Sequence, residues 1–163
     1  MNKLKEKNPN YKVYLISILV IFIDQLTKIL VMINMNLGTE IKIIPNFFSL
    51  IYLVNNGAAL STFQNQRALI IIVSLFCMAL IVSLMQREKN MTKLKTISFG
   101  ILIGGMLSNL IDRVFYKHVV DFISFTIFNY KCPIFNIADI GITVGVLIYI
   151  IINIYEEIIE KRK

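Results

Sequence analysis

The four aspartates of this sequence are the side chains best placed to do chemistry, because each lies inside or beside a long apolar stretch: Asp24, Asp112, Asp121 and Asp139. The glutamates lie at more polar positions, such as Glu88 and the C-terminal segment. An ionised side chain at the centre of a bilayer costs about 2.5–3.5 kcal/mol on insertion scales, so it needs a partner, water or a function. The aspartates are therefore candidates for a site.

Asp121 and Asp139 have the positions that acid–base chemistry needs. Asp121 follows the third apolar stretch and Asp139 opens the fourth. Two carboxylates brought together can share one proton, so that one acts as a base while the other stays neutral as an acid. A pair of this kind can activate water against a peptide bond. The alternative is structural, since Asn136 and Asp139 are also plausible caps of the helix that starts there.

Two further polar clusters lie within apolar stretches. Asp24 and Lys28 are four residues apart, so on one face of a helix they can form an ion pair. Asn109, Asp112 and Arg113 share a face by the same spacing, and we expect Arg113 to pair with a carboxylate or to hold substrate backbone. Small residues precede this cluster and allow another helix to approach closely: Gly104, Gly105 and Ser108. Both clusters are also consistent with a polar network that only fastens helices.

A metal site, a covalent nucleophile and a nucleic-acid surface are not expected. The chain has one histidine, His118, and two cysteines, Cys77 and Cys132, without a Cys-x-x-Cys motif. No serine has a histidine or lysine placed to activate it as a nucleophile. The net charge of +7 comes from basic residues at the edges of apolar stretches, where they serve as anchors, and not from a basic surface interleaved with aromatics.

Composition predicts the elements that must position these residues. The chain is 56% hydrophobic and 17% charged, whereas soluble domains are about 45–50% apolar and 25% charged. Stretches of about 20 apolar residues can span a bilayer, and four are present: residues 13–34, 68–86, 96–115 and 139–155. We predict a membrane all-α protein with a small β component, formed as a single domain over residues 1–163.

Charge sets the expected topology. Most basic residues lie in the N-terminal tail, in the segment between the second and third spans, and in the C-terminal tail. The positive-inside rule then places both termini in the cytoplasm and residues 35–67 and 116–138 outside. Residues 40–54, with a break at Pro45 and Asn46, and residues 119–128 are rich in β-formers. We expect them to form a small sheet on the outer membrane surface.

Five short motifs, taken together, resemble the bacterial lipoprotein signal peptidases (signal peptidase II) over essentially the whole chain. The third lies in the third span and the last opens the fourth. The motifs occur in the family's order: Asp-Gln-Leu-Thr-Lys at 24–28, Asn-Asn-Gly-Ala-Ala at 55–59, Asn-Leu-Ile-Asp-Arg at 109–113, Val-Val-Asp-Phe at 119–122 and Phe-Asn-Ile-Ala-Asp at 135–139.

This resemblance implies an intramembrane aspartic endopeptidase of the bacterial cytoplasmic membrane, with its active site near the outer face. Such an enzyme cuts lipidated prolipoproteins before a diacylglyceryl-modified cysteine, uses no cofactor or metal, has an outer β-cradle and is inhibited by globomycin. We expect a monomer surrounded by membrane lipid. Asp121 and Asp139 match the catalytic dyad. Other residues match substrate-binding or supporting positions: Asp24, Lys28, Asn55, Gly57, Asn109, Asp112, Arg113, Asn136 and Ala138.

The chain departs from the family's usual pattern at Val54, Leu60 and Ser108, which bear on the shape of the substrate groove. Two other functional classes fit the sequence less well. A proton-coupled carrier would use the aspartates as relays, but the polar residues cluster at one membrane face and do not form a path across it. Aspartyl proteases of the presenilin and prepilin-peptidase types carry a Gly-x-Gly-Asp motif, which this sequence lacks.

Overall fold

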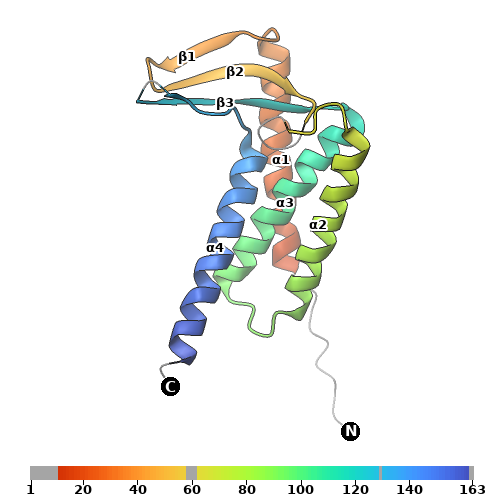
Figure 1. The fold of residues 1–163 in the computed structure, drawn as a ribbon, viewed down its shortest axis with the longest axis vertical. Helices are drawn as coiled ribbons and strands as arrows, with labels where there is room; N and C mark the ends of the chain where they lie inside the picture. Colours follow the sequence, from red (N-terminus) through yellow and green to blue (C-terminus); the bar gives the residue numbers. More distant parts are fainter. Residues whose placement is uncertain (1–10, 58–61, 129, 162–163) are drawn as a thin grey trace.

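The computed structural model describes residues 11–57, 62–128 and 130–161, and its four long helices form a bundle with a sheet across one end (Figure 1). Each helix is long and apolar enough to cross a membrane. They are α1 (Tyr11–Asn34), α2 (Arg67–Arg87), α3 (Lys93–Phe115) and α4 (Ile137–Glu160). The four predicted spans are thus confirmed, although α4 continues past the predicted end at 155. Its last turns are charged, so an apolar pattern ends before the helix does.

The sheet is formed by the segments predicted as strands. It contains β1 (Glu40–Ile44), β2 (Phe48–Asn55), β3 (Val119–Ile127) and β4 (Tyr130–Lys131), antiparallel in the order β1-β2-β3-β4. Asn46 turns the chain between β1 and β2 with a positive φ of 58°. No strand was predicted after residue 128, but β4 pairs back on β3. A two-residue strand is too short to produce an alternating pattern.

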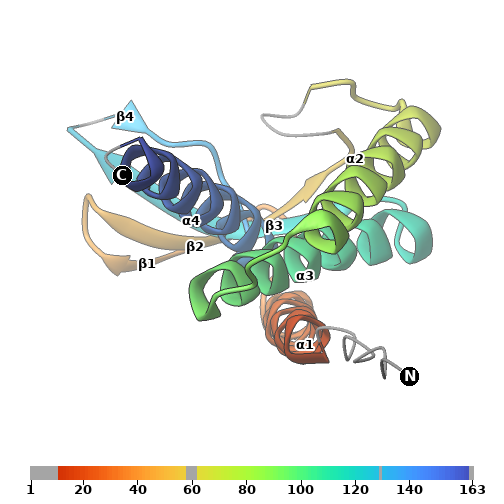
Figure 2. The same cartoon turned by 90° about the horizontal axis from the view of Figure 1, so that it is seen from below.

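Helix α3 lies at the centre of the bundle and contacts α1, α2 and α4 (Figure 2). Glycines permit its closest contacts. A Cβ on Gly104 would lie 2.8 Å from the carbonyl oxygen of Ser17 in α1, and a Cβ on Gly105 would meet the Ala138 carbonyl of α4. The close approach predicted at these two small residues is therefore confirmed.

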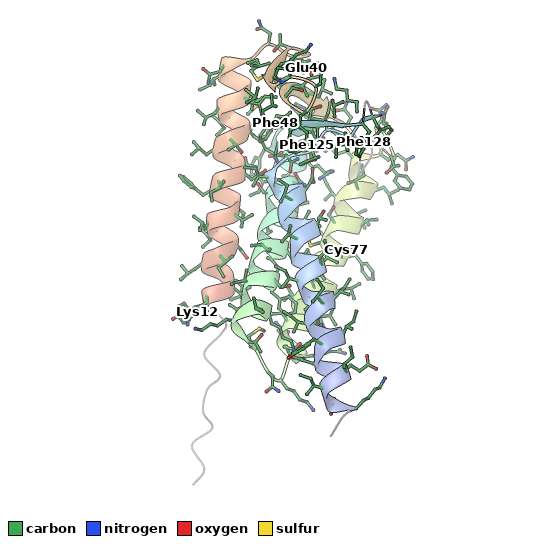
Figure 3. The ribbon with its side chains drawn as sticks, turned by 90° about the vertical axis from the view of Figure 1, so that its left-hand side faces the viewer. Lys12, Glu40, Phe48, Cys77, Phe125 and Phe128 are labelled. Carbon is green, nitrogen blue, oxygen red and sulfur yellow. The ribbon has the colours of Figure 1, made fainter. Side chains whose placement is uncertain are left out.

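Two apolar clusters bracket a polar layer. One cluster surrounds Phe99, in the half of the bundle away from the sheet. The other lies between α1 and β3 and includes Val31 and Val120. Figure 3 shows Lys12 and the sheet residue Phe48 at opposite ends of the molecule, with Cys77 between them on α2. The buried polar residues of the predicted site lie between the two clusters.

Candidate active site

A buried ammonium group forms the centre of the polar layer. Lys28 Nζ lies 2.6 Å from Asp24 Oδ2 and 2.7 Å from Asp112 Oδ2, and all three side chains are at most 2% exposed. It also donates a hydrogen bond to Asn109 Oδ1 at 3.0 Å. Within the described chain Asp112 Oδ2 accepts no directed hydrogen bond, so the ion pair alone compensates its burial. The predicted Asp24–Lys28 pair is confirmed, and Asp112 is the partner that local spacing did not indicate.

Asp24 connects the first helix with the last. Its Oδ1 accepts the Ala138 backbone N–H at 2.8 Å, and its Oδ2 accepts the Ser108 hydroxyl at 2.7 Å. Ala138 lies in the first turn of α4, whose unpaired N–H groups favour a negative charge. Asp24 therefore holds the start of α4 in place. Ser108, one of the departures named above, adds a hydrogen bond to this junction through its hydroxyl.

Asn136 and Asp139 form the predicted cap. Asn136 Oδ1 accepts the Asp139 backbone N–H at 3.0 Å, and Asp139 Oδ2 accepts the Asn136 backbone N–H at 3.2 Å. The other oxygen of Asp139 accepts an N–H from Asn109 Nδ2 at 2.8 Å. Asp139 is only half-buried. Capping of α4 by Asp139 is therefore compatible with a part for Asp139 in acid–base chemistry.

Asp121 lies in β3 and shares a partner with Asp139. Its Oδ1 accepts a hydrogen bond from Asn136 Nδ2 at 2.7 Å, and its Oδ2 accepts one from Asn55 Nδ2 at 2.9 Å. Asn136 is 0% exposed and Asp121 5%. Burial raises the pKa of Asp121 to about 6, the nearby Asp139 carboxylate adds to that increase, and the hydrogen bonds from Asn55 and Asn136 oppose it. The two aspartates thus lie on either side of one buried amide.

Arg113 holds backbone carbonyls. Its Nη1 donates to the Asn109 carbonyl at 3.1 Å and its Nη2 donates to the Gly57 carbonyl at 3.0 Å. None of the ion pairs between described residues includes Arg113, so of the two roles expected for it, pairing with a carboxylate is not observed, and holding substrate backbone stays a prediction. The reason for the missing ion pair is that Lys28 already occupies Asp112. The Gly57 N–H in turn binds Asn55 Oδ1 at 2.9 Å, so Arg113 and Asn55 together fix this turn.

Two of the departures from the family pattern named above flank residues 55–57 in the sequence. Val54 is in β2, where it pairs with Val120. Leu60, and the Ala58 and Ala59 of the 55–59 motif, lie outside the described residues.

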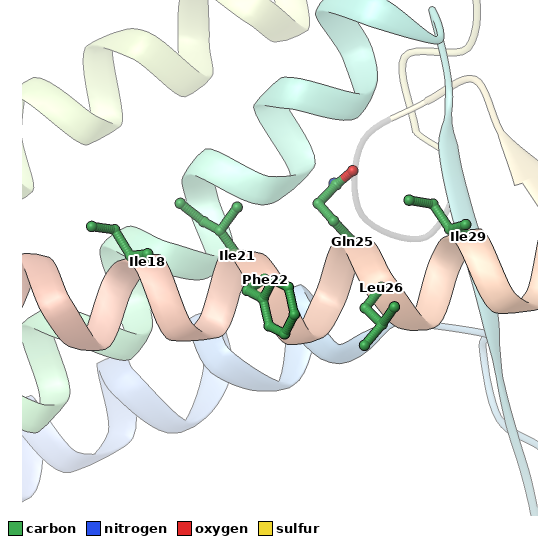
Figure 4. A pocket seen from close by; sticks show the side chains of 6 residues that line it. All are labelled: Ile18, Ile21, Phe22, Gln25, Leu26 and Ile29. Carbon is green, nitrogen blue, oxygen red and sulfur yellow. The ribbon is translucent and has the colours of Figure 1, made fainter.

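Gln25 also belongs to this network, although no role was predicted for it. Its Nε2 donates to Asp112 Oδ1 at 2.6 Å and to Ser108 Oγ at 3.0 Å. An amide inside an apolar span, next to Asp24, was the signal that could have identified it. Gln25 also lines an apolar groove of about 380 Å³ on α1, which contains neither Asp121 nor Asp139 (Figure 4). The lining residues are Ile18, Ile21, Phe22, Gln25, Leu26 and Ile29.

The arrangement can perform acid–base chemistry. It brings together two carboxylates, of which one is buried and one half-buried, and gives every carboxylate oxygen one N–H donor. Across residues 11–57, 62–128 and 130–161, no three histidine, cysteine or acidic side chains are grouped as metal ligands.

The chain is similar to known proteins over most of its length. The structure is similar to two bacterial membrane enzymes solved by the in meso method. One, at 2.3 Å resolution, is 32% identical with a TM-score of 0.83, over 89% of this chain and 88% of the other. The second, at 1.9 Å, is 34% identical with a TM-score of 0.77, over 85% and 90%. The family model for signal peptidase (SPase) II matches residues 16–155, and the chain therefore belongs to the signal peptidase II family.

Proposed function

We propose that Asp121 and Asp139 are the catalytic dyad of this peptidase and that they activate water for cleavage of the signal peptide. Membership of the family makes the chain a membrane-embedded protease that removes signal peptides from lipoproteins. One observation supports the dyad above others. Asn136 donates to Asp121 through its side chain and to Asp139 through its backbone, at 2.7 and 3.2 Å.

The proposed reaction needs one proton on the pair. The ionised aspartate takes a proton from water as the water oxygen attacks the scissile carbonyl carbon. The protonated aspartate polarises the carbonyl oxygen and then gives its proton to the leaving nitrogen as the C–N bond breaks. A pKa of about 6 for Asp121 supports a pair that keeps one proton close to neutral pH.

The position of the pair suits a lipid-modified substrate. Asp121 lies in the sheet and Asp139 in the first turn of α4, at the junction of the sheet and the apolar helices (Figure 1). A peptide at this junction would pass near Asn55, while diacylglyceryl chains on its cysteine would lie among the helices, in lipid. We propose that cleavage occurs before this cysteine, near the outer membrane face, in a monomer with a single peptidase domain, and that globomycin-type inhibitors occupy the same place.

The test is cleavage of a lipidated prolipoprotein by the purified enzyme, followed by mass spectrometry. Wild type should release the signal peptide, and the same substrate without its diacylglyceryl group should stay uncut. Asp121→Asn and Asp139→Asn should each lower the rate roughly a thousandfold or more while the protein stays folded. Glu40→Gln, which changes a carboxylate of β1, is the matched control and should cleave normally. Near-normal cleavage by either aspartate variant contradicts the dyad.

A further inference from the structure

We propose that Lys28, acting through the Asn109 amide, makes Asp139 the charged base of the pair and leaves the shared proton on Asp121. This inference rests on the dyad proposed above and assigns a separate role to each aspartate. Lys28 is a positioning residue in this account, because it contacts neither Asp121 nor Asp139 by the hydrogen bonds or ion pairs described.

The first step is the orientation of the Asn109 amide. An ammonium group has only donors, so the Asn109 atom 3.0 Å from Lys28 Nζ must be the oxygen. The nitrogen of the same amide must then point the other way, where it lies 2.8 Å from Asp139 Oδ1. Because Lys28 is held by ion pairs with Asp24 and Asp112, it cannot turn away to release the amide.

The second step is polarisation. An amide whose oxygen accepts from a cation is a stronger donor through its nitrogen, because successive hydrogen bonds polarise one another in a medium of low dielectric constant. Asn109 therefore transmits part of the Lys28 charge to Asp139. A strengthened donor favours the ionised form of the carboxyl group that accepts from it.

The amides that bind Asp121 are placed differently. Asn136 uses its oxygen to accept the neutral backbone N–H of Asp139, and Asn55 uses its oxygen to accept the neutral backbone N–H of Gly57. Asp121 is also the more deeply buried of the pair, at 5% exposure. Burial favours the neutral form of a carboxyl group.

Other charges face the pair from the surrounding helices. Asp24 on α1 and Asp112 on α3 oppose a further negative charge, but both are paired with Lys28. The Arg113 guanidinium on α3 attracts both carboxylates. These charges act on both carboxylates, so the Asn109 amide is the group that distinguishes Asp139 from Asp121.

The roles complete a balanced reaction. Asp139 takes one proton from water, and the hydroxide oxygen forms a bond to the carbonyl carbon. The C–N bond then breaks, and its electron pair goes to the nitrogen, which receives the Asp121 proton. Asp139 is left protonated and Asp121 ionised, and a proton transfer between them restores the starting state.

The test compares the pH dependence of kcat/KM in wild type, Asn109→Ala and Asn55→Ala, with a synthetic lipidated prolipopeptide as substrate. In a bell-shaped profile the acidic limb reports protonation of the base, and the alkaline limb reports loss of the proton from the acid. Asn109→Ala removes a donor from Asp139, so the acidic limb should move up by about one pH unit. Asn55→Ala removes a donor from Asp121, so the alkaline limb should move up instead.

The assignment is overturned if Asn109→Ala moves the alkaline limb and Asn55→Ala the acidic limb. It is also overturned if neither limb moves in either variant. Asn55 is only half-buried, so Asn55→Ala alone decides the question if Asn109→Ala fails to fold. A shift of its acidic limb would make Asp121 the base. Failure of the dyad itself gives a different result, because Asp121→Asn or Asp139→Asn would then still cleave the substrate.

Discussion

The side-chain amide of Asn136 lies 2.7 Å from Asp121 Oδ1 and thereby joins the N-cap of α4 to β3. The same side chain also caps α4 through its oxygen. A movement of the helix relative to the sheet would break both bonds. Asn136 thus couples the stability of α4 to the geometry of the proposed site.

Asn136→Ala should therefore affect stability and activity together. Loss of a helix N-cap costs about 0.5–2 kcal/mol, and the Asp121 carboxyl group would lose one of its donors. The measurement is thermal unfolding in one detergent together with the cleavage rate. Thr92→Ala is the matched control, because Thr92 caps α3 through its side chain and belongs to no part of the site. The control should lose similar stability with normal cleavage, and equal losses of cleavage in both variants would contradict the coupling.

Lys28→Met should destabilise the protein strongly. It would leave Asp24 and Asp112 buried without a cation, which costs about 3–5 kcal/mol. Adding Asp24→Asn and Asp112→Asn to this variant should recover much of the lost stability, because no buried charge is then unpaired. Lys161→Met removes the exposed pair with Glu157 and should change little. Unfolding by denaturant measures the stability of all three variants. A Lys28→Met protein as stable as wild type would contradict the buried cluster.

Asp121 should make the folded protein less stable as pH rises. Its pKa is raised from an ordinary value of 3.8 to about 6 in the folded state. The folded state therefore binds the proton more tightly than the unfolded chain, and this stabilisation is present at low pH and lost between about pH 4 and 6. Asp121→Asn should be more stable than wild type at pH 7 by up to about 3 kcal/mol, with the difference vanishing below about pH 4.

Glu40 should show the opposite pH dependence of folding stability. Hydrogen bonds from Ser49 and Lys131 hold the pKa of Glu40 below its ordinary value. Glu40→Gln should therefore lose stability at neutral pH and match wild type in acid. If Asp121→Asn showed this same pattern, the raised pKa of Asp121 would be wrong.

Arg113→Ala should act on the turn around Gly57 more than on global stability. Removal of a charged donor to backbone carbonyls costs about 1.5–3 kcal/mol, less than the loss of a buried ion pair. Cleavage should fall because the turn also holds Asn55, which donates to Asp121. Arg113→Lys keeps the charge without the two-pronged geometry and should recover stability better than activity. Normal cleavage by Arg113→Ala would remove this residue from the site.

The orientation of the protein can be tested through its cysteines. If both termini lie in the cytoplasm, Cys132, which follows β4, faces outward, while Cys77 lies within α2. A membrane-impermeant thiol reagent added to intact cells should label Cys132 and spare Cys77. Cys132→Ser should lose the label. Labelling that requires opened cells would reverse the predicted topology.

Local patterns predicted the parts of the structure that depend on neighbouring residues. Apolar length identified the four helices, and the four-residue spacing predicted the Asp24–Lys28 pair. The contact of Lys28 with Asp112 joins segments far apart in the chain, so no spacing indicated it. The alignment of Asp121 with Leu53 depends on an irregularity in the β2–β3 register, which no strand pattern specifies. The roles proposed for Asp121 and Asp139 depend on the family resemblance, since capping explains Asp139 equally well.

The hydrogen bond between Asp24 and the Ala138 backbone joins α1 to the first turn of α4 across a separation of 114 residues in the chain. The proposed acid–base pair combines Asp121 of β3 with Asp139 of α4, so it is complete only when α4 has docked against α1 and α3. On this proposal a folding intermediate with an undocked α4 is inactive, and cleavage activity itself becomes a measure of correct helix assembly.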